Sequence, residues 1–264
     1  MTNGKVRTAE MTWREVEEAV QRGAAAIVPM GSTEEHGPHS PTGDYAIADV
    51  IAERVARETG DVMIPTIPFS YSEYFRHYPG TITLQPETMR LLVKDTVECL
   101  LDQGFRHVIL LNGHKGNEPI LFPLIRQIRR ERQTLVPIVA PLAFGLAGGL
   151  VKELYGDTPT GHGGEPIGSI MAHLFPENMR LDLAEDWDVK PFFGQPSAGL
   201  NGIVFEGKQV GLAINMGDIT PPSGSLSEPR NASADKGERI VTASVKNLSA
   251  FVRWYKTTDP SVPA

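Results

Sequence analysis

Short apolar runs alternate with amphipathic segments along the first half of this chain, and this alternation limits the folds that it can adopt. Four apolar runs are predicted strands: AAAIVPM, DVMIPTIPF, RHVILLNGH and TLVPIVAPLAF. Four segments between and before them are predicted helices: WREVEEAVQRG, YAIADVIAERVARETG, PETMRLLVKDTVECLLDQG and EPILFPLIRQIRRERQ. Strands and helices that alternate in this way form a parallel sheet with helices on both faces. The predicted fold class is therefore α/β, a three-layer α/β/α sandwich with a mainly parallel central sheet.

The second half of the chain has a weaker pattern but no sign of a second domain. From about residue 186 the sequence is rich in Gly and Pro, and ADKGERIVTASVKNLSAFVRWYK then supplies a last predicted helix. No internal repeat, low-complexity tract or linker divides the 264 residues. We expect residues 1–264 to form a single domain, which is long enough to bury a substantial core.

Composition and charge argue against several classes of function. The net charge is −7 and the longest basic run is RQIRRER, which disfavours nucleic acid as a partner. No apolar stretch reaches the roughly 18 residues that a membrane span requires, and the polar N-terminal sequence lacks the features of a secretory signal. Cys99 is the single cysteine, so no internal disulfide can form. These features predict a cytoplasmic protein whose partner is a small molecule.

Polar residues gather directly after two of the predicted strands. MGSTEEHGPHSPTGD, residues 30–44, contains Glu34, His36 and Asp44, and NGHKGN contains His114. Open parallel sheets bind their ligands beyond the carboxyl ends of the strands. Glu34 and His36 are two residues apart, so in an extended segment their side chains project to the same side. We therefore expect the two segments to converge on one site.

A third segment, TGHGGEP, places His162 and Glu165 beside glycines. Two or three imidazoles with three carboxylates and no thiol suit zinc, manganese or iron in a hydrolytic site rather than a structural zinc site. Alternatively, each of these side chains is a solvated loop group, and the glycines and prolines serve only as turn residues. The recurrence of the pattern in three segments favours a metal site. No nucleophile elbow, dinucleotide fingerprint or P-loop offers a competing chemistry.

These motifs resemble those of a known family. GSTEEHGPHSPTGD, NGHKGN, GHGGE and GSLSEPRNASADKGERI resemble, in this order, the characteristic segments of the creatininase (creatinine amidohydrolase) family, and YPGTITL resembles its FPGT segment. The resemblance extends from about residue 11 to about residue 254. It implies an α/β/α sandwich, two divalent metal ions per chain, hydrolysis of a small amide-like substrate, and a homohexamer. Zinc is the first expectation for the metal, with manganese and iron as alternatives.

The resemblance also implies a set of metal ligands. Glu34 and His36 match the first two ligands of the family, one for each metal. Asp44 matches the carboxylate that bridges the two ions, and His114 matches the imidazole beside Glu34. The loop before this aspartate is one residue shorter than in many members, and the next acid, Asp49, falls inside a predicted helix.

The remaining site residues depart from creatininase or lie beside its motifs. Creatininase has a ligand glutamate two residues after the His of its NGH motif, where this chain has Gly116. It has an apolar residue where this chain has Glu165, so we expect Glu165 to supply the missing carboxylate. His162 matches the catalytic histidine and is the expected general acid for the leaving nitrogen. Glu35 either orients a ligand or is exposed, and His39 is expected to be structural or to line the pocket.

The sequence disfavours creatinine itself as the substrate. Creatinine-cleaving members surround the ring with tryptophans, one of them four residues before the catalytic His, and this chain has Thr158 there. It has no tryptophan between Trp13 and Trp187. The loop PFSYSEYFRHYPGT is polar and aromatic, and either binds the substrate or forms a surface or subunit contact. The candidate substrate-binding residues are Tyr71, Glu73, His77 and His39.

Three functions remain open at this point. The first is a metal-dependent amidohydrolase in which a hydroxide between two metals attacks a cyclic amide or a formamide. The second is a hydrolase that opens a non-amide ring, such as that of a keto-inositol of the 3-dehydro-scyllo-inosose type. The third is a non-catalytic metal-binding homologue, which would be expected to have lost at least one ligand. Because all five expected ligand positions are present, an enzyme is favoured.

Overall fold

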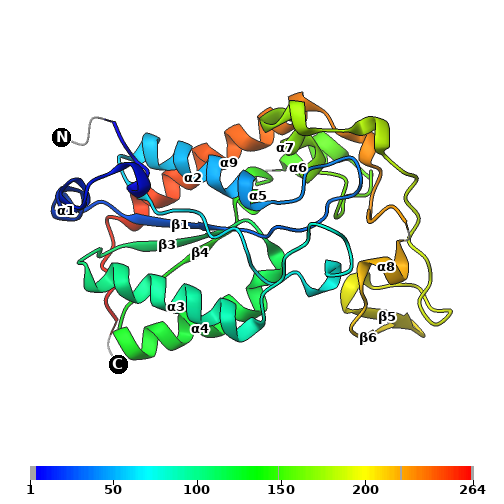
Figure 1. The fold of residues 1–264 in the computed structure, drawn as a ribbon, viewed down its shortest axis with the longest axis horizontal. Helices are drawn as coiled ribbons and strands as arrows, with labels where there is room; N and C mark the ends of the chain where they lie inside the picture. Colours follow the sequence, from blue (N-terminus) through cyan, green and yellow to red (C-terminus); the bar gives the residue numbers. More distant parts are fainter. Residues whose placement is uncertain (1–3, 148, 221, 263–264) are drawn as a thin grey trace.

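A parallel four-stranded sheet runs through the centre of the computed structural model, which describes residues 4–147, 149–220 and 222–262. Its strands are β1 (Ala26–Met30), β2 (Val62–Met63), β3 (Val108–Asn112) and β4 (Ile138–Val139). They lie in the order β2-β1-β3-β4, and every pair of neighbours is parallel. β1 and β3 form the centre of the sheet (Figure 1).

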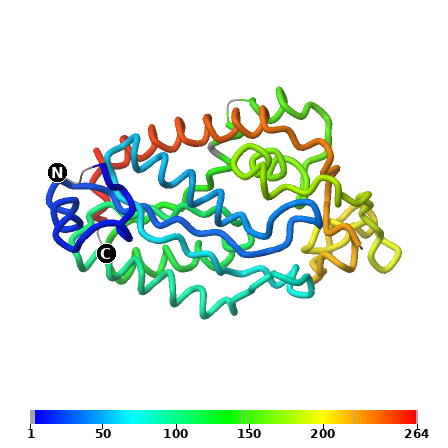
Figure 2. The backbone as a smooth tube through the Cα atoms, turned by 45° about the horizontal axis from the view of Figure 1, so that its top comes forward, coloured from blue at the N-terminus to red at the C-terminus, as the bar shows by residue number. Residues whose placement is uncertain are grey.

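Helices cover both faces of this sheet. One face carries α2 (Tyr45–Thr59), α7 (Ile167–Leu174) and α9 (Ala234–Tyr255), with the shorter α5 (Pro141–Gly145) and α6 (Leu150–Tyr155) beside them. The other carries α3 (Pro86–Asp102) and α4 (Glu118–Arg132), and α1 (Trp13–Gln21) packs into the same core. Figures 1 and 2 show the two helical layers with the sheet between them. The predicted α/β/α sandwich is thus confirmed.

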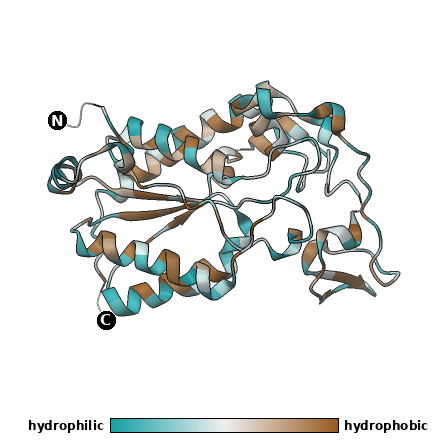
Figure 3. Cartoon of the chain, in the orientation of Figure 1, coloured by the Kyte–Doolittle hydropathy of each residue, from teal (hydrophilic) through white to brown (hydrophobic). Residues whose placement is uncertain are grey.

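Alternate side chains of the central strands enter two separate cores. Ile27 and Ile109 pack among α2, α7 and α9, whereas Val28 and Leu110 pack among α1, α3 and α4. Successive residues of a strand point to opposite faces, and here both faces are covered by helices. The strands are therefore continuously hydrophobic, as Figure 3 shows by their brown colour.

Local sequence signals explain where several helices begin and end. Thr12 and Glu15 form a capping box at the start of α1, in which Thr12 N donates to Glu15 Oε2 at 2.7 Å. α2 ends at Gly60, whose φ of 73° is the left-handed conformation that glycine adopts without strain. Pro86 begins α3, where its missing N–H costs no hydrogen bond.

Two of the predicted strands are shorter than their apolar runs. Of DVMIPTIPF only Val62–Met63 forms a strand, and isolated bridges such as Met30 with Ile67 continue the pairing. Of TLVPIVAPLAF only Ile138–Val139 does, and α5 begins at Pro141. Both runs contain prolines, which cannot donate to a sheet ladder, so regular pairing stops early.

The Gly/Pro-rich stretch after about residue 186 contains structure that the sequence pattern did not predict. β5 (Gly202–Phe205) and β6 (Lys208–Gly211) form an antiparallel hairpin, followed by α8 (Met216–Ile219). These elements form a small lobe beyond the carboxyl ends of the central strands (Figures 1 and 2). Each has only four residues, which is too short for a periodic pattern to stand out.

The segments that connect these elements contain several short 3₁₀ helices. None of the helices in the described ranges is long and apolar enough to cross a membrane. The 3₁₀ helices are Thr8–Glu10, Glu73–Phe75, Lys115–Asn117, Pro176–Asn178, Leu181–Leu183, Gly199–Asn201 and Pro229–Asn231.

Candidate active site

Two polar loops leave adjacent strands at the same edge of the sheet. The register pairs Met30, the last residue of β1, with Asn112, the last residue of β3. Gly113 N donates to the carbonyl of Met30 at 2.7 Å, so the loops after the two strands start side by side. The third predicted segment joins them, because His162 Nε2 lies 2.7 Å from the carbonyl oxygen of Glu35. The convergence expected from the sequence is therefore present.

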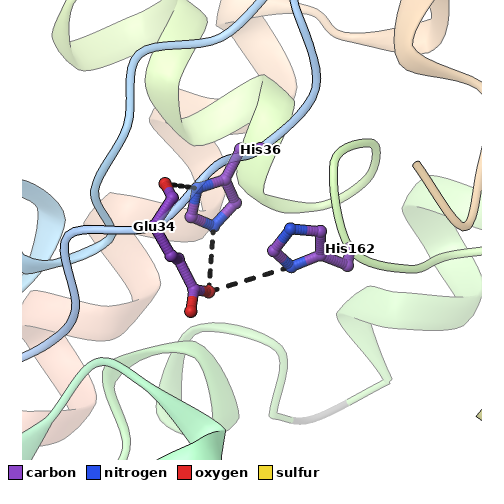
Figure 4. Close-up of side chains that lie close together, drawn as sticks. All are labelled: Glu34, His36 and His162. Carbon is purple, nitrogen blue, oxygen red and sulfur yellow. Dashed lines mark hydrogen bonds and ion pairs between the residues drawn. The ribbon is translucent and has the colours of Figure 1, made fainter. Parts of the chain in front are cut away.

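The carboxylate of Glu34 lies at the centre of this cluster. Its side chain is buried, and three imidazoles surround one of its oxygens, Oε1. The distances are 3.2 Å to His114 Nδ1, 3.7 Å to His36 Nε2 and 3.8 Å to His162 Nδ1. Figure 4 shows two of these rings, His36 and His162, turned toward the Glu34 carboxylate.

Each of the three imidazoles is anchored through its other nitrogen. That nitrogen faces a backbone carbonyl: Tyr71 O for His114 (3.0 Å), Glu34 O for His36 (3.2 Å) and Glu35 O for His162 (2.7 Å). A carbonyl oxygen can only accept, so the anchored nitrogen carries a proton. In the neutral ring the remaining nitrogen then presents a lone pair to Glu34 Oε1. Histidines that bind metals are usually held in this way.

Asp44 completes one side of the cluster. Its Oδ2 lies 2.9 Å from His114 Nδ1, and its Oδ1 accepts a hydrogen bond from Ser32 N at 2.5 Å. Asp49, one turn into α2, points elsewhere and pairs with Arg7 at 2.6 Å. The structure thus brings Asp44, and not Asp49, to the site.

Sequence analysis missed Ser72, which holds the second oxygen of Glu34. Ser72 is fully buried, and its Oγ donates to Glu34 Oε2 at 2.5 Å. The same Oγ contacts the hydroxyl of Ser32 and lies 3.4 Å from His114 Nε2. A serine in a polar loop has no spacing that distinguishes it, so only the fold assigns it to the site.

His162 is held on both faces and at one edge. Phe75 stacks on one face with a centroid distance of 4.2 Å, and His36 stacks on the other at 4.6 Å. Glu35 Oε1 lies 3.2 Å from His162 Nε2, while Glu35 Oε2 accepts a hydrogen bond from Gly37 N at 2.7 Å. Glu35 is buried and not exposed, and its side chain contacts His162 and not one of the predicted ligands.

Close backbone packing explains the glycines around His162. Leu226 N donates to the carbonyl of His162 at 2.8 Å, which lays the GSLSEP segment directly over the GHGG loop. A Cβ on Gly161 would lie 2.8 Å from Leu226 Cβ, and one on Gly164 would lie 2.8 Å from the carbonyl oxygen of Ser227. Side chains at these two positions would therefore push the two motifs apart.

Glu165 is buried near the cluster, but it has different partners. Its Oε2 accepts from Tyr155 OH at 3.0 Å, and its Oε1 accepts from Ser169 Oγ at 2.8 Å and from Lys236 Nζ at 3.0 Å. Glu165 lines the same pocket, but it belongs to neither group of ligand atoms that lie within 4.8 Å of one another. His162, predicted as an acid, stands in one of those groups instead.

The four predicted substrate-binding residues do not line the pocket above the cluster. Tyr71 contributes its backbone carbonyl to His114, and exposed Glu73 pairs with Arg76 at 3.1 Å. The ring of His77 lies beside that of Tyr78, with a centroid distance of 4.3 Å and a tilt of 41° between the rings. His39 is buried and is not among the residues that line the pocket.

A pocket of about 850 Å³ opens above the cluster. In the loop PFSYSEYFRHYPGT, the residues that line this pocket are Tyr74 and Phe75, which lie between the predicted residues Glu73 and His77. Much of the remaining wall is apolar: Phe122, Leu142, Ile167, Leu200 and Leu226. Thr160, Asn201, Lys115 and Glu118 add polar groups. No tryptophan is among the lining residues.

The charges of the cluster depend on one another. Burial raises the pKa of Glu34, but the positive charges of the imidazoles, His114 first, outweigh burial and hold it at about 2. Burial lowers the pKa of His114, and the carboxylates of Glu34 and Asp44 raise it well above its usual value. The buried carboxylates therefore require positive charge between them, from imidazolium protons or from a metal ion.

The donors fit divalent metal ions. The ligand atoms of Glu34, Asp44 and His114 lie within 4.8 Å of one another, and so do those of Glu34, His36 and His162. Nitrogen and carboxylate oxygen without thiolate suit zinc or manganese in a site that is open to a substrate. Glu34 belongs to both groups. A carboxylate common to two groups of ligand atoms is expected where two metal ions would be bound next to each other.

Comparisons with known proteins agree with this geometry. The sequence profile of a family described as creatininase, creatinine amidohydrolase, matches residues 9–252. The chain is 26% identical to the creatinine amidohydrolase of Pseudomonas putida, over 94% of this chain and 96% of that protein. It is 30% identical to the 3-dehydro-scyllo-inosose hydrolase of Thermotoga maritima, over 92% of this chain and 81% of that protein.

A further relative and a solved structure extend the comparison. The chain is 27% identical to the mycofactocin precursor peptide peptidase of Mycobacterium ulcerans, over 88% of this chain and 86% of that protein. A crystal structure of creatinine amidohydrolase superimposes with a TM-score of 0.82 at 25% identity, covering 96% of this chain and 98% of the other. Solved creatininases of the same fold include a manganese form and a zinc form.

Proposed function

Because this chain belongs to the creatininase family, we propose that it is a metal-dependent hydrolase that cleaves a C–N amide bond of a small cyclic amide or a formamide. One observation carries this proposal. The buried imidazoles of His36 and His114 and the partly buried imidazole of His162 are each anchored through one nitrogen and face the same oxygen of Glu34 with the other. Nitrogen and carboxylate atoms that are held in place and converge in this way suit a catalytic metal centre.

Two divalent ions would be held by Glu34, His36, Asp44 and His114, with Glu165 as the proposed fifth ligand. When bound, the ions would activate water for attack and polarise the carbonyl of the substrate. Ser72 fixes the orientation of the Glu34 carboxylate through its short hydrogen bond. Glu165 Oε2 accepts only one hydrogen bond and so keeps a free lone pair. Tyr155, Ser169 and Lys236 would support it as outer partners.

His162 is the proposed proton donor to the leaving nitrogen. Burial lowers its pKa, but the hydrogen bond and charge of Glu35 raise it above the usual value, which favours the protonated form that an acid needs. With Nε2 bonded to Glu35, Nδ1 is the atom that would give the proton. Glu35 thus acts as a positioning residue, and the stacked Phe75 keeps water from one face of the ring.

A second candidate function is the hydrolysis of a non-amide ring such as that of a keto-inositol. The 30% identity to 3-dehydro-scyllo-inosose hydrolase over 92% of this chain favours it. The pocket also lacks a tryptophan, and position 158, where creatininase places one, is an exposed threonine. Creatinine is therefore not the proposed substrate.

A substrate panel with two readouts tests the proposal. Zinc- and manganese-loaded protein is incubated with cyclic amides, formamides, creatinine and a keto-inositol, and the release of ammonia, amine or formate is measured beside ring opening. Opening of a cyclic amide, which leaves a new amine and a new carboxylate in one product, or release of formate from a formamide supports the first candidate. Ring opening of the keto-inositol without turnover of any amide supports the second. His162→Ala is the control variant. It should keep its metal and lose turnover, whereas loss of metal would make His162 a ligand.

A further inference from the structure

One charged side chain in the pocket has no partner in the site described so far. Lys115 lies between His114, a proposed ligand, and Gly116, and it lines the pocket from the 3₁₀ helix Lys115–Asn117. It is the one lysine or arginine among the lining residues. Within the described ranges, its ammonium group makes no ion pair or hydrogen bond with protein.

The acids of the pocket are engaged elsewhere, with one exception. Glu34 and Asp44 face the imidazoles, and Glu165 bonds to Lys236. Glu118 is the remaining acid in the lining, at the first position of α4, where a negative charge favours the helix end. No ion pair joins Glu118 to Lys115, so the lysine charge stays available to a ligand.

The pocket leaves the charge of Lys115 accessible. Lys115 is exposed to solvent, and Phe122, Leu142 and Leu200 make much of the wall apolar. The pocket, at about 850 Å³, has room for more than a single reacting amide. A group of the substrate that extends from the metal cluster toward Lys115 would therefore be selected by its charge.

We propose that Lys115 selects amide substrates that carry an anionic group, such as a carboxylate, beside the bond to be cleaved. The proposal rests on the proposed function, whose substrate class it narrows. Lysine acts as a mobile point charge and not as a planar fork. It would therefore discriminate by charge more than by the shape of the anionic group.

Matched pairs of probes that differ only in charge test this idea. N-formylglycine is compared with N-formylglycinamide, and 2-pyrrolidinone-5-carboxylate with 2-pyrrolidinone-5-carboxamide. For zinc-loaded protein, kcat/KM is measured by turnover and Kd by calorimetry. We expect the anionic member to be favoured about tenfold, the size of a hydrogen bond to a charged group. Lys115→Ala should remove the preference, Lys115→Arg should keep it, and Lys115→Glu should reverse it.

Two control variants separate Lys115 from general electrostatics. Lys208→Ala removes the same charge from the exposed strand β6 and should leave the preference unchanged. Glu118→Gln removes the opposing charge in the pocket and should strengthen binding of the anionic probes. If neither pair is hydrolysed, the amidase proposal fails, while the calorimetric comparison still decides the role of Lys115. The proposal would be overturned if both members of each pair had equal kcat/KM and Kd values, or if Lys115→Ala still favoured the anionic member.

Discussion

Asp44 is the proposed bridge between the two ions, although the structure places it in one ligand group, with Glu34 and His114, and the residue that the two groups share is Glu34. Asp44 is buried, contacts His114 at 2.9 Å and is held by the backbone of Ser32. Losing a residue that only supports a metal ligand typically lowers metal affinity by roughly ten- to hundredfold. Asp44→Ala should lower the affinity for both ions by more than this, because it removes a proposed ligand itself. Elemental analysis after gel filtration measures the metal per chain.

Asp49→Ala provides a matched control for this test. Asp49 lies five residues further on and pairs with Arg7 away from the cluster, so its loss should leave the metal content unchanged. Two metals per chain in Asp44→Ala would show that Asp44 is not the bridging ligand.

Glu165 has two possible roles to be distinguished, that of a metal ligand and that of a buried charge partner of Lys236. Glu165→Gln keeps the shape of the side chain but removes its charge. If Glu165 is the fifth ligand, this variant should lose the second ion selectively and keep the one held by Glu34, Asp44 and His114. Lys236→Met is the control, because it removes the charge opposite Glu165 and leaves the carboxylate in place.

The two outcomes for Glu165 can be read from metal content and stability together. Full metal content in Glu165→Gln with a lower free energy of unfolding would identify Glu165 as a structural partner of Lys236. Selective metal loss in Glu165→Gln, but not in Lys236→Met, would support the ligand role.

At the residue scale, sequence patterns predicted which side chains gather at the strand ends better than they predicted the surroundings of those side chains. Glu34, His36, Asp44 and His114 could be named because they follow strands in Gly- and Pro-rich loops, and the fold brings strand ends together. Ser72 could not be named, because a buried serine hydroxyl has no pattern of its own. The loop that carries it was singled out, but the pocket takes Tyr74 and Phe75 from it, since the direction of each side chain depends on a non-repetitive backbone.

At the scale of elements, the GHGG loop and the GSLSEP segment form one unit. Their contact leaves no space for a Cβ at Gly164, which would lie 2.8 Å from Ser227 O. Gly164→Ala should therefore destabilise the protein by about 2 kcal/mol through overpacking. It should also reduce turnover, because His162 moves with the loop. Urea unfolding and activity assays measure the two effects.

Gly168→Ala is the matched control for this prediction. Gly168 lies in α7, and a Cβ there would approach no atom closer than Ala232 Cβ at 3.4 Å. Alanine is the better helix former by about 1 kcal/mol, so this variant should be neutral or more stable. Equal stabilities for the two variants would contradict the argument from close packing.

The long helices were predictable and the short elements were not. α2, α3, α4 and α9 each have many turns over which an apolar face repeats, with Gly60 and Pro86 to mark boundaries. β5 and β6 have four residues each, so tertiary contacts and not periodicity determine them. The apolar runs that contain prolines predicted strands correctly but could not predict where pairing stops.

At the scale of the whole molecule, the lobe around β5 and β6 exposes apolar side chains. Phe193 is 80% exposed, Phe205 50% and Val210 43%. Phe193 also has a φ of 51°, a conformation that strains a bulky residue. A strained and exposed phenylalanine does not stabilise the single chain, so we expect this lobe to contact another copy of the protein, in agreement with the hexamer implied by the family resemblance.

Light scattering at micromolar concentration tests this assembly. The wild-type mass should be a multiple of the 28.8 kDa chain, six of them in a hexamer. Phe193→Asn together with Phe205→Thr should lower it, because asparagine tolerates the positive φ and both changes remove apolar contact area without strain. Lys208→Ala in the same hairpin removes no apolar surface and should keep the assembly. A wild-type protein that is monomeric would reject the assembly, and an oligomer that survives the double variant would show that its interface lies outside this lobe.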